Sequence, residues 1–140
     1  MSNPAAFLVL TGSLCILISL VQAWCLSGML ILENPGLKKL FPSYQNLLKS
    51  HIDYILMSLL LFAFYLLYAH FDITPHGALV IATCMGSLIN PFGFLLLAMK
   101  PDLAQNMPKP IGALVIGGFI LTTTGYAGGA LLVAKAVLSA

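Results

Sequence analysis

Four long apolar runs, separated by short polar links, constrain this chain more than any other feature. We place them at residues 4–32, 47–68, 76–98 and 111–138. Each run is long enough to cross a hydrocarbon core of about 30 Å as a helix. Only helices and closed barrels satisfy the backbone in lipid, and runs without period-two alternation are typical of helices. The prediction is an all-α, single-domain bundle of four transmembrane helices.

The composition supports lipid as the solvent for most of the surface. Charged residues make up 7% of the chain and apolar residues 60%. In a soluble domain, roughly a quarter of all residues are charged. The N-terminal MSNPAAFLVL lacks the basic stretch of a cleaved signal peptide, so we expect the first run to be a retained span. Cys15, Cys25 and Cys84 lie in apolar runs without a CxxC pair, which indicates neither a disulfide framework nor a zinc site.

The basic residues are all lysine, and they predict the topology. Without clustered arginines, nucleic acid and anionic ligands are disfavoured as partners. Five lysines fall in or beside the first and third links, residues 33–47 and 99–110: Lys38, Lys39, Lys49, Lys100 and Lys109. Only Lys135 lies on the other side. The positive-inside rule then predicts that both lysine-bearing links are cytoplasmic and both termini are outside.

Polar, aromatic and small residues gather on one face of each of the last three runs. At about 100° per residue, the second run presents His51, Tyr54, Ser58, Phe62 and Tyr65 on one face. The matching faces hold Thr83, Ser87, Asn90 and Phe94 in the third run and Gly118, Thr122, Tyr126 and Gly129 in the fourth. We predict that the three faces share an interior surface.

Helix-packing and helix-breaking residues lie on the same faces. The spacing Gly125-x-x-x-Gly129 is typical of glycines that let membrane helices approach closely. Pro91 removes a backbone hydrogen bond and is expected to kink the third helix. The amide of Asn90 beside it either repairs that break or contacts a ligand, and both alternatives stay open at this point.

Among the residues on these faces, His51 can take part in the largest number of reactions, because neutral imidazole is a versatile metal ligand and general base. It either heads the inward face or reaches interfacial water beside Lys49. His70 and His76 lie near the opposite end, so a transmembrane electron-transfer haem with paired histidines is not expected. Asp53 projects away from the polar face, and we expect it to pair with Lys49 or to face the headgroups.

Two stretches, KSHIDYILMS (49–58) and INPFGF (89–94), together with four spans, resemble the small membrane isomerases. This group includes styrene oxide isomerase and, more distantly, hydroxylaminobenzene mutase. The resemblance implies a b-type haem with His51 as axial ligand, held between subunits of a trimer in a bacterial inner membrane. It also implies that ferric iron acts as a Lewis acid in a 1,2-rearrangement of a small apolar substrate, such as an epoxide, without net redox change.

The polar faces and the resemblance together name candidate site residues. We assign His51 and Ser58 to the cofactor, and Tyr54, Asn90 and Tyr126 to catalysis. The sequence departs from the family pattern at three places: Met57 stands where the family has asparagine, Phe94 where it has tyrosine, and Gly86-Ser87 where it has an acidic residue.

The sequence also bears on two other functions. A glutathione-dependent membrane enzyme of the eicosanoid class needs arginines for its anionic tripeptide, and this sequence has none. A non-catalytic membrane subunit or small carrier fits a chain without a hydrophilic domain, and it is the alternative to the isomerase.

Overall fold

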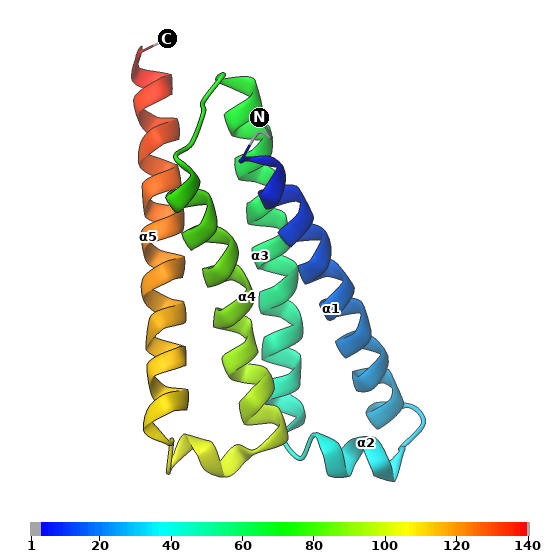
Figure 1. Cartoon of the computed structure of the whole chain (residues 1–140). Coiled ribbons are helices and arrows are strands. Elements are labelled where there is room, and N and C mark those ends of the chain that lie inside the picture. Colours follow the sequence, from blue (N-terminus) through cyan, green and yellow to red (C-terminus); the bar gives the residue numbers. More distant parts are fainter. Residues whose placement is uncertain (1–3, 140) are drawn as a thin grey trace.

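The structure, a computed structural model, describes residues 4–139. Four long helices run side by side (Figure 1): α1 (Ala6–Leu30), α3 (Tyr44–His70), α4 (Gly77–Met99) and α5 (Lys109–Ser139). Each is long and apolar enough to cross a membrane, and no strand occurs within residues 4–139. The predicted all-α bundle of four spans is therefore confirmed, and the helix ends fall within three residues of the predicted ones.

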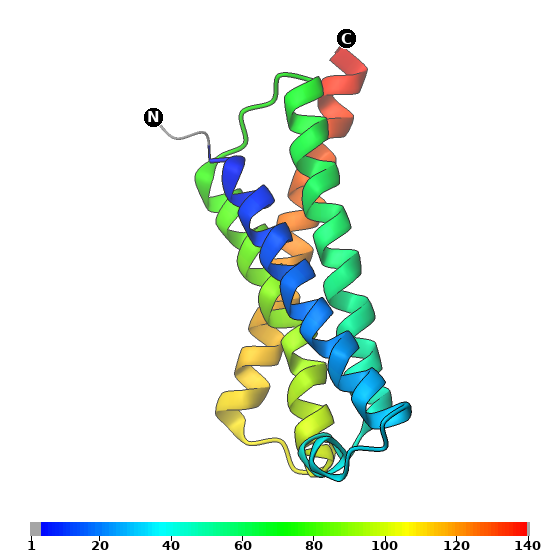
Figure 2. The same cartoon turned by 90° about the vertical axis from the view of Figure 1, so that its right-hand side faces the viewer.

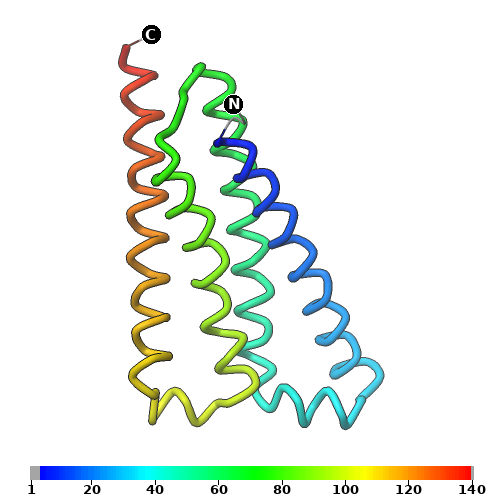
Figure 3. Tube along the Cα trace, in the orientation of Figure 1, coloured from blue at the N-terminus to red at the C-terminus, as the bar shows by residue number. Residues whose placement is uncertain are grey.

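The two lysine-bearing links are more regular than expected. A short helix, α2 (Pro35–Leu40), lies across the end of the bundle, and a 3-10 turn, η1 (Pro101–Ala104), precedes α5 (Figures 1 and 3). The α2 helix begins where Asn34 Oδ1 accepts a hydrogen bond from the Leu37 amide at 3.1 Å, with Pro35 in the first helical position. The first polar link therefore contains a short helix, which was not predicted from the sequence.

The two ends of the bundle differ in charge. The start of α1, the end of α5 and the α3–α4 connection lie at one end, whereas α2 and η1 lie at the other (Figures 1 and 2). Lys38, Lys39 and Lys100 are exposed at the α2 end, whereas Lys135 lies near the end of α5. The predicted partition of the lysines between the two ends is thus confirmed, and the side of the membrane that each end faces stays a prediction.

The outer surface of the helices is apolar. Trp24 is 79% exposed, Leu131 71% and Leu10 67%, and many other large apolar side chains are exposed along the same helices. A water-facing surface does not carry apolar side chains at this density, whereas hydrocarbon solvates them. The protein is a multi-pass membrane protein.

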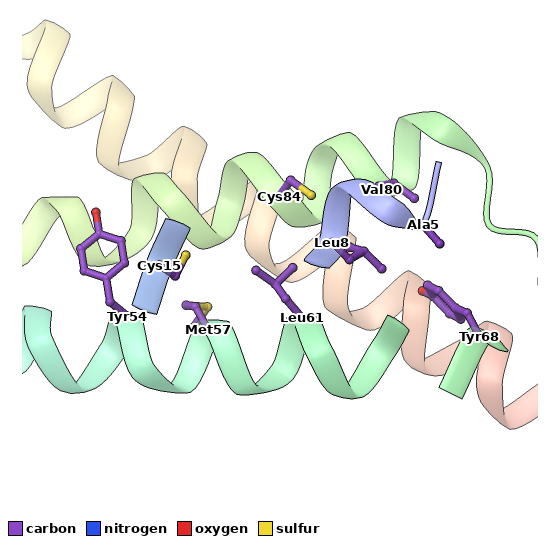
Figure 4. Packing of buried hydrophobic residues seen from close by; sticks show 9 residues of the cluster. All are labelled: Ala5, Leu8, Cys15, Tyr54, Met57, Leu61, Tyr68, Val80 and Cys84. Atoms are coloured by element: carbon purple, nitrogen blue, oxygen red, sulfur yellow. The ribbon is translucent and has the colours of Figure 1, made fainter. Parts of the chain in front are cut away.

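Inside the bundle, α1 packs mainly on α3 and α5 mainly on α4, while the α3–α4 contact joins the two pairs. Figure 4 shows the shared core, in which side chains of α1, α3 and α4 meet. Glycines allow the close α4–α5 approach: a Cβ at Gly86 would lie 2.5 Å from the Thr122 nitrogen, and one at Gly125 2.6 Å from Thr83 Cα. The predicted packing role of Gly125 and Gly129 is confirmed, since both are buried.

Candidate functional site

Side chains of neighbouring helices donate to α4 carbonyls around Pro91. Pro91 has no N–H, so the Ser87 carbonyl loses its usual donor within the helix. Three donors reach α4 carbonyls around this point: Cys15 Sγ to Ser87 O at 4.0 Å, Tyr54 Oη to Leu88 O at 3.0 Å, and Ser50 Oγ to Pro91 O at 3.0 Å. Asn90 is not among them, so the repair alternative for its amide is not supported.

Three of the predicted site hydroxyls are engaged inside the bundle. Ser58 is fully buried and donates to the Gly12 carbonyl at 2.8 Å, and the Tyr54 ring points from α3 toward α4 (Figure 4). Tyr126 Oη lies 2.7 Å from Ser87 Oγ. Because these hydroxyl groups already bind core partners, the structure gives Ser58, Tyr54 and Tyr126 a packing role and does not bring them to one cavity.

His51 lies on the flank of α3 that faces α1. Its Nδ1 is 3.0 Å from the Ser19 carbonyl oxygen and 2.9 Å from Ser19 Oγ. A carbonyl only accepts, so we assign the ring proton to Nδ1, and Ser19 Oγ then donates to the His51 carbonyl at 3.4 Å. In this tautomer Nε2 carries a lone pair, and it has no hydrogen-bond partner within residues 4–139. Metal-binding histidines are oriented in this way, by a hydrogen bond from the other ring nitrogen to a carbonyl.

A second polar pair lies on the same two helices. Gln22 is 4% exposed, and its Nε2 donates to Ser50 Oγ at 2.8 Å. Its Oε1 has no partner in the described part of the chain. Sequence reasoning missed Ser19, Gln22 and Ser50. The signal was present, since Thr11, Cys15, Ser19 and Gln22 recur at helical spacing and form a polar face on the first span.

Asp53 lies on the opposite flank of α3 and meets α4. Asn90 Nδ2 donates to Asp53 Oδ2 at 3.4 Å. The expected pairing of Asp53 with Lys49 is wrong: the Lys49 ammonium lies over the Phe94 ring, 6.0 Å from its centroid, and α4 supplies the partner of the carboxylate. The expectation that Asp53 faces the headgroups is not supported either, because its side chain turns toward a neighbouring helix.

A cavity of about 100 Å³ lies between α4 and α5 beside this pair. Asn90 is the polar residue of its lining, and the remainder is apolar, including Phe94, Val115 and Phe119. Phe119 is 56% exposed, so the cavity reaches the bilayer-facing surface of the helix pair. Of the three predicted catalytic residues, Asn90 lines this cavity, and Tyr54 and Tyr126 do not.

The predicted site residues are divided between the two flanks of α3. Two residues of a helix at i and i+2 point about 200° apart, and accordingly His51 bonds α1 while Asp53 bonds α4. A single chain thus does not bring His51 and Asn90 to a common ligand. No group of three or more His, Cys, Asp or Glu residues suited to a bare metal ion occurs in residues 4–139, and a haem needs no such group because its porphyrin supplies four ligands.

Comparison of the chain with protein-family models, with curated proteins and with solved structures found no match.

Proposed function

We propose that this protein binds haem b through His51 Nε2 and acts as a membrane isomerase for a small apolar substrate such as an epoxide. The observation that carries the proposal is the imidazole geometry. Nδ1 is held by the Ser19 carbonyl at 3.0 Å, and Nε2 is left with a free lone pair. One oriented imidazole is a sufficient protein ligand for a haem iron.

Around His51, there is room for a large planar group only on the outside of the bundle. The interior between α1, α3 and α4 is filled, since Cys15 and Leu61 are fully buried. His51 itself is half-buried, and the next residue, Ile52, is 48% exposed. A haem on His51 would therefore lie along the outer flank of α1 and α3, where a second protomer can cover it. This placement supports a cofactor that is shared between subunits.

The proposed reaction conserves atoms and electrons. One C–O bond of the epoxide breaks, a hydrogen moves with its electron pair to the neighbouring carbon, and the oxygen becomes a carbonyl. A bound ferric haem supplies a Lewis acid for this chemistry. The chain supplies the iron ligand, His51, and an amide, Asn90, that can hydrogen-bond a polar group in an apolar, water-poor cavity. A chain without arginine suits a neutral substrate that arrives from the bilayer.

We further propose a homo-oligomer, a trimer by the resemblance, in a bacterial inner membrane with α2 and η1 on the cytoplasmic side. The lysine-rich α2 end supports the orientation. The separation of His51 and Asn90 on opposite flanks of α3 supports the oligomer, because the Asp53 flank of one copy can complete the His51 flank of another.

The first test is optical. Protein purified in detergent from haem-replete cells is expected to show a Soret band, which is lost in His51→Ala and kept in His70→Ala. His70 is an exposed histidine at the far end of the same helix, which makes it a matched control. A colourless, iron-free wild-type protein would contradict the proposal and favour the non-catalytic subunit or carrier.

The second test addresses the shared site. Styrene oxide is used as the probe substrate, with formation of the aldehyde as the readout. His51→Ala and Asn90→Leu are each expected to lose this activity, and co-expression of the two is expected to restore part of it, since mixed oligomers contain some intact sites. If co-expression restores nothing while both variants co-purify, the site does not combine residues of two copies.

A further inference from the structure

We infer that a recess at the C-terminal end of α3 binds a small organic ammonium ion. The recess lies where the connection to α4 leaves α3 (Figure 1), and its volume is about 110 Å³. Its lining includes Tyr65, Tyr68, Asp72 and Thr74. The residues of the proposed cofactor and substrate sites do not line it, so the inference goes beyond the proposed function and is tested separately.

Asp72 gives the recess a negative charge without a counter-ion. Within residues 4–139, its carboxylate makes no ion pair and no hydrogen bond, although Lys135 lies at the same end of the bundle. The carboxylate also stands at the C-terminal end of α3, where the carbonyl groups of the last turn add negative partial charge. The recess therefore attracts a cation and repels an anion.

The backbone places Asp72 beside the tyrosines. Its φ of 52° is left-handed, and the next amide, that of Ile73, donates to the Tyr68 carbonyl at 2.8 Å. This hydrogen bond folds the chain back against the last turn of α3. Glycine is usual at such a position, and among the other residues aspartate and asparagine tolerate it best. Asp72→Asn therefore removes the charge without a change of backbone.

The two tyrosine rings favour an organic cation over a metal ion. Cations, including quaternary ammonium groups, are attracted to aromatic faces. Tyr68 is 4% exposed and packs against Phe64, with ring centroids 5.7 Å apart, so its ring is held in place before a ligand binds. Calcium and magnesium ions need several oxygen ligands. The recess offers one carboxylate, and residues 4–139 contain no group of three or more His, Cys, Asp or Glu suited to a metal.

The volume limits the part of the ligand that enters the recess. An engineered apolar cavity of about 150 Å³ binds benzene, so a recess of about 110 Å³ takes a slightly smaller group, such as trimethylammonium. Asp72 and Thr74 are exposed, so the remainder of the ligand leaves through the opening that they border. Because the end of a span lies at headgroup level, the ammonium group belongs either to a phospholipid or to a soluble molecule.

The experiment measures saturation-transfer difference NMR titrations of the whole protein in micelles of dodecyl maltoside, an uncharged detergent, with empty micelles as the blank. The probes are choline and its uncharged carbon analogue, in which a tert-butyl group replaces trimethylammonium. The two probes have the same shape and differ in charge. We expect saturable binding of choline, about tenfold tighter than that of the analogue.

Variants of the lining are compared with matched variants at the other end of the bundle. Asp72→Asn and Tyr65→Leu are each expected to weaken choline binding by about tenfold. Asp102→Asn changes an exposed aspartate of η1, and Tyr44→Leu changes the first tyrosine of α3, so both are expected to leave binding unchanged. Circular dichroism checks folding, and Asp72→Asn tests the inference even if Tyr65→Leu does not fold.

Nanodiscs distinguish the two sources of the ammonium group. The choline titration is repeated in phosphatidylglycerol nanodiscs with and without phosphatidylcholine. Weaker choline binding in the presence of phosphatidylcholine supports the inference with a lipid headgroup as the occupant, and equal binding supports it with a soluble ammonium ion.

Three outcomes would overturn the inference. Equal binding of the two probes would show that charge is not recognised, and the absence of saturable binding would show no site. Unchanged binding in a folded Asp72→Asn protein would place the cation elsewhere. None of these outcomes bears on the Soret band assigned to His51, so failure here is distinguishable from failure of the proposed function.

Discussion

The two flanks of α3 hold polar pairs of opposite kinds. On the α1 flank, His51 is fixed by the backbone carbonyl and the hydroxyl of Ser19, at 3.0 and 2.9 Å. On the α4 flank, Asp53 and Asn90 make one side-chain contact of 3.4 Å beside a cavity. The first pair orients one ring nitrogen and frees the other, whereas the second keeps several acceptors free. The first arrangement leaves one oriented imidazole nitrogen unused, whereas the second joins α3 and α4 through a single long hydrogen bond.

The core between the two flanks shows why most polar residues of this bundle are not site residues. Tyr54, Ser50 and Ser58 all donate to backbone carbonyls of neighbouring helices. In hydrocarbon such carbonyls have no water as an alternative partner, so these hydroxyls stabilise helix contacts. A polar residue in a span is therefore informative about ligands only when its hydrogen-bonding capacity remains unused.

The largest expected effect on stability is at the α4–α5 contact, on which the cavity flank depends. Gly86→Ala places a methyl group 2.5 Å from the Thr122 nitrogen, so it is expected to lower the free energy of unfolding by about 1–3 kcal/mol. Unfolding titrations in mixed micelles measure the change. Gly117→Ala, whose methyl meets nothing within 4 Å, is the control. Equal stability of the two variants would mean that α4 and α5 do not pack this closely.

A smaller loss is expected when a side-chain donor to α4 is removed. Ser50→Ala removes the hydroxyl that donates to the Pro91 carbonyl and leaves Gln22 Nε2 without its partner, at an expected cost of about 1 kcal/mol. Ser13→Ala removes an exposed bond within one helix and serves as the control, with an expected change within about 0.5 kcal/mol. A neutral Ser50→Ala would contradict a stabilising role of this hydroxyl in the α3–α4 contact.

Tyr54→Phe separates a structural hydroxyl from a catalytic one. Because Tyr54 Oη donates to the Leu88 carbonyl, its loss is expected to cost about 0.5–1 kcal/mol of stability and to leave the Soret band and the probe reaction unchanged. Absorbance spectra and aldehyde formation measure the two properties on the same preparation. A folded Tyr54→Phe protein without activity would show that the tyrosine hydroxyl has a catalytic role.

The smallest effect is expected at Gln22. Gln22→Met removes the donor to Ser50 Oγ, but it also removes an oxygen that is buried without a partner in the described chain. The two changes oppose each other, so the variant is expected to lose less stability than Ser50→Ala in the same unfolding titration. A larger loss would mean that Gln22 Oε1 has a partner, such as a buried water.

The helices were predictable because their signal is averaged over about twenty residues, and lipid leaves few alternatives to a helix. The short α2 helix was missed because two local features specify it, the Asn34 cap and Pro35. Both residues are also common in turns. Periodicity detects long elements, and short capped ones require attention to individual side chains.

The candidate site was only partly predictable. Periodicity assigned His51 and Tyr54 to one face, but it gives directions around one helix and does not say which neighbour lies in each direction. The structure divides that face between α1 and α4, and Asp53, which was expected to pair with Lys49 or face the headgroups, contacts Asn90. Ser19 was missed because interior faces were predicted for the last three spans alone, although the polar residues of the first span also recur at helical spacing.

The most direct measurement of the central claim is rescue of haem binding by free imidazole. His51→Gly, purified without haem and then mixed with hemin, is expected to show no Soret band of a histidine-ligated haem. Addition of imidazole is expected to restore that band, since the small ligand replaces the missing ring without a change of fold. A His51→Gly protein that binds hemin as the wild type does, with a spectrum that imidazole leaves unchanged, would show that His51 is not the iron ligand.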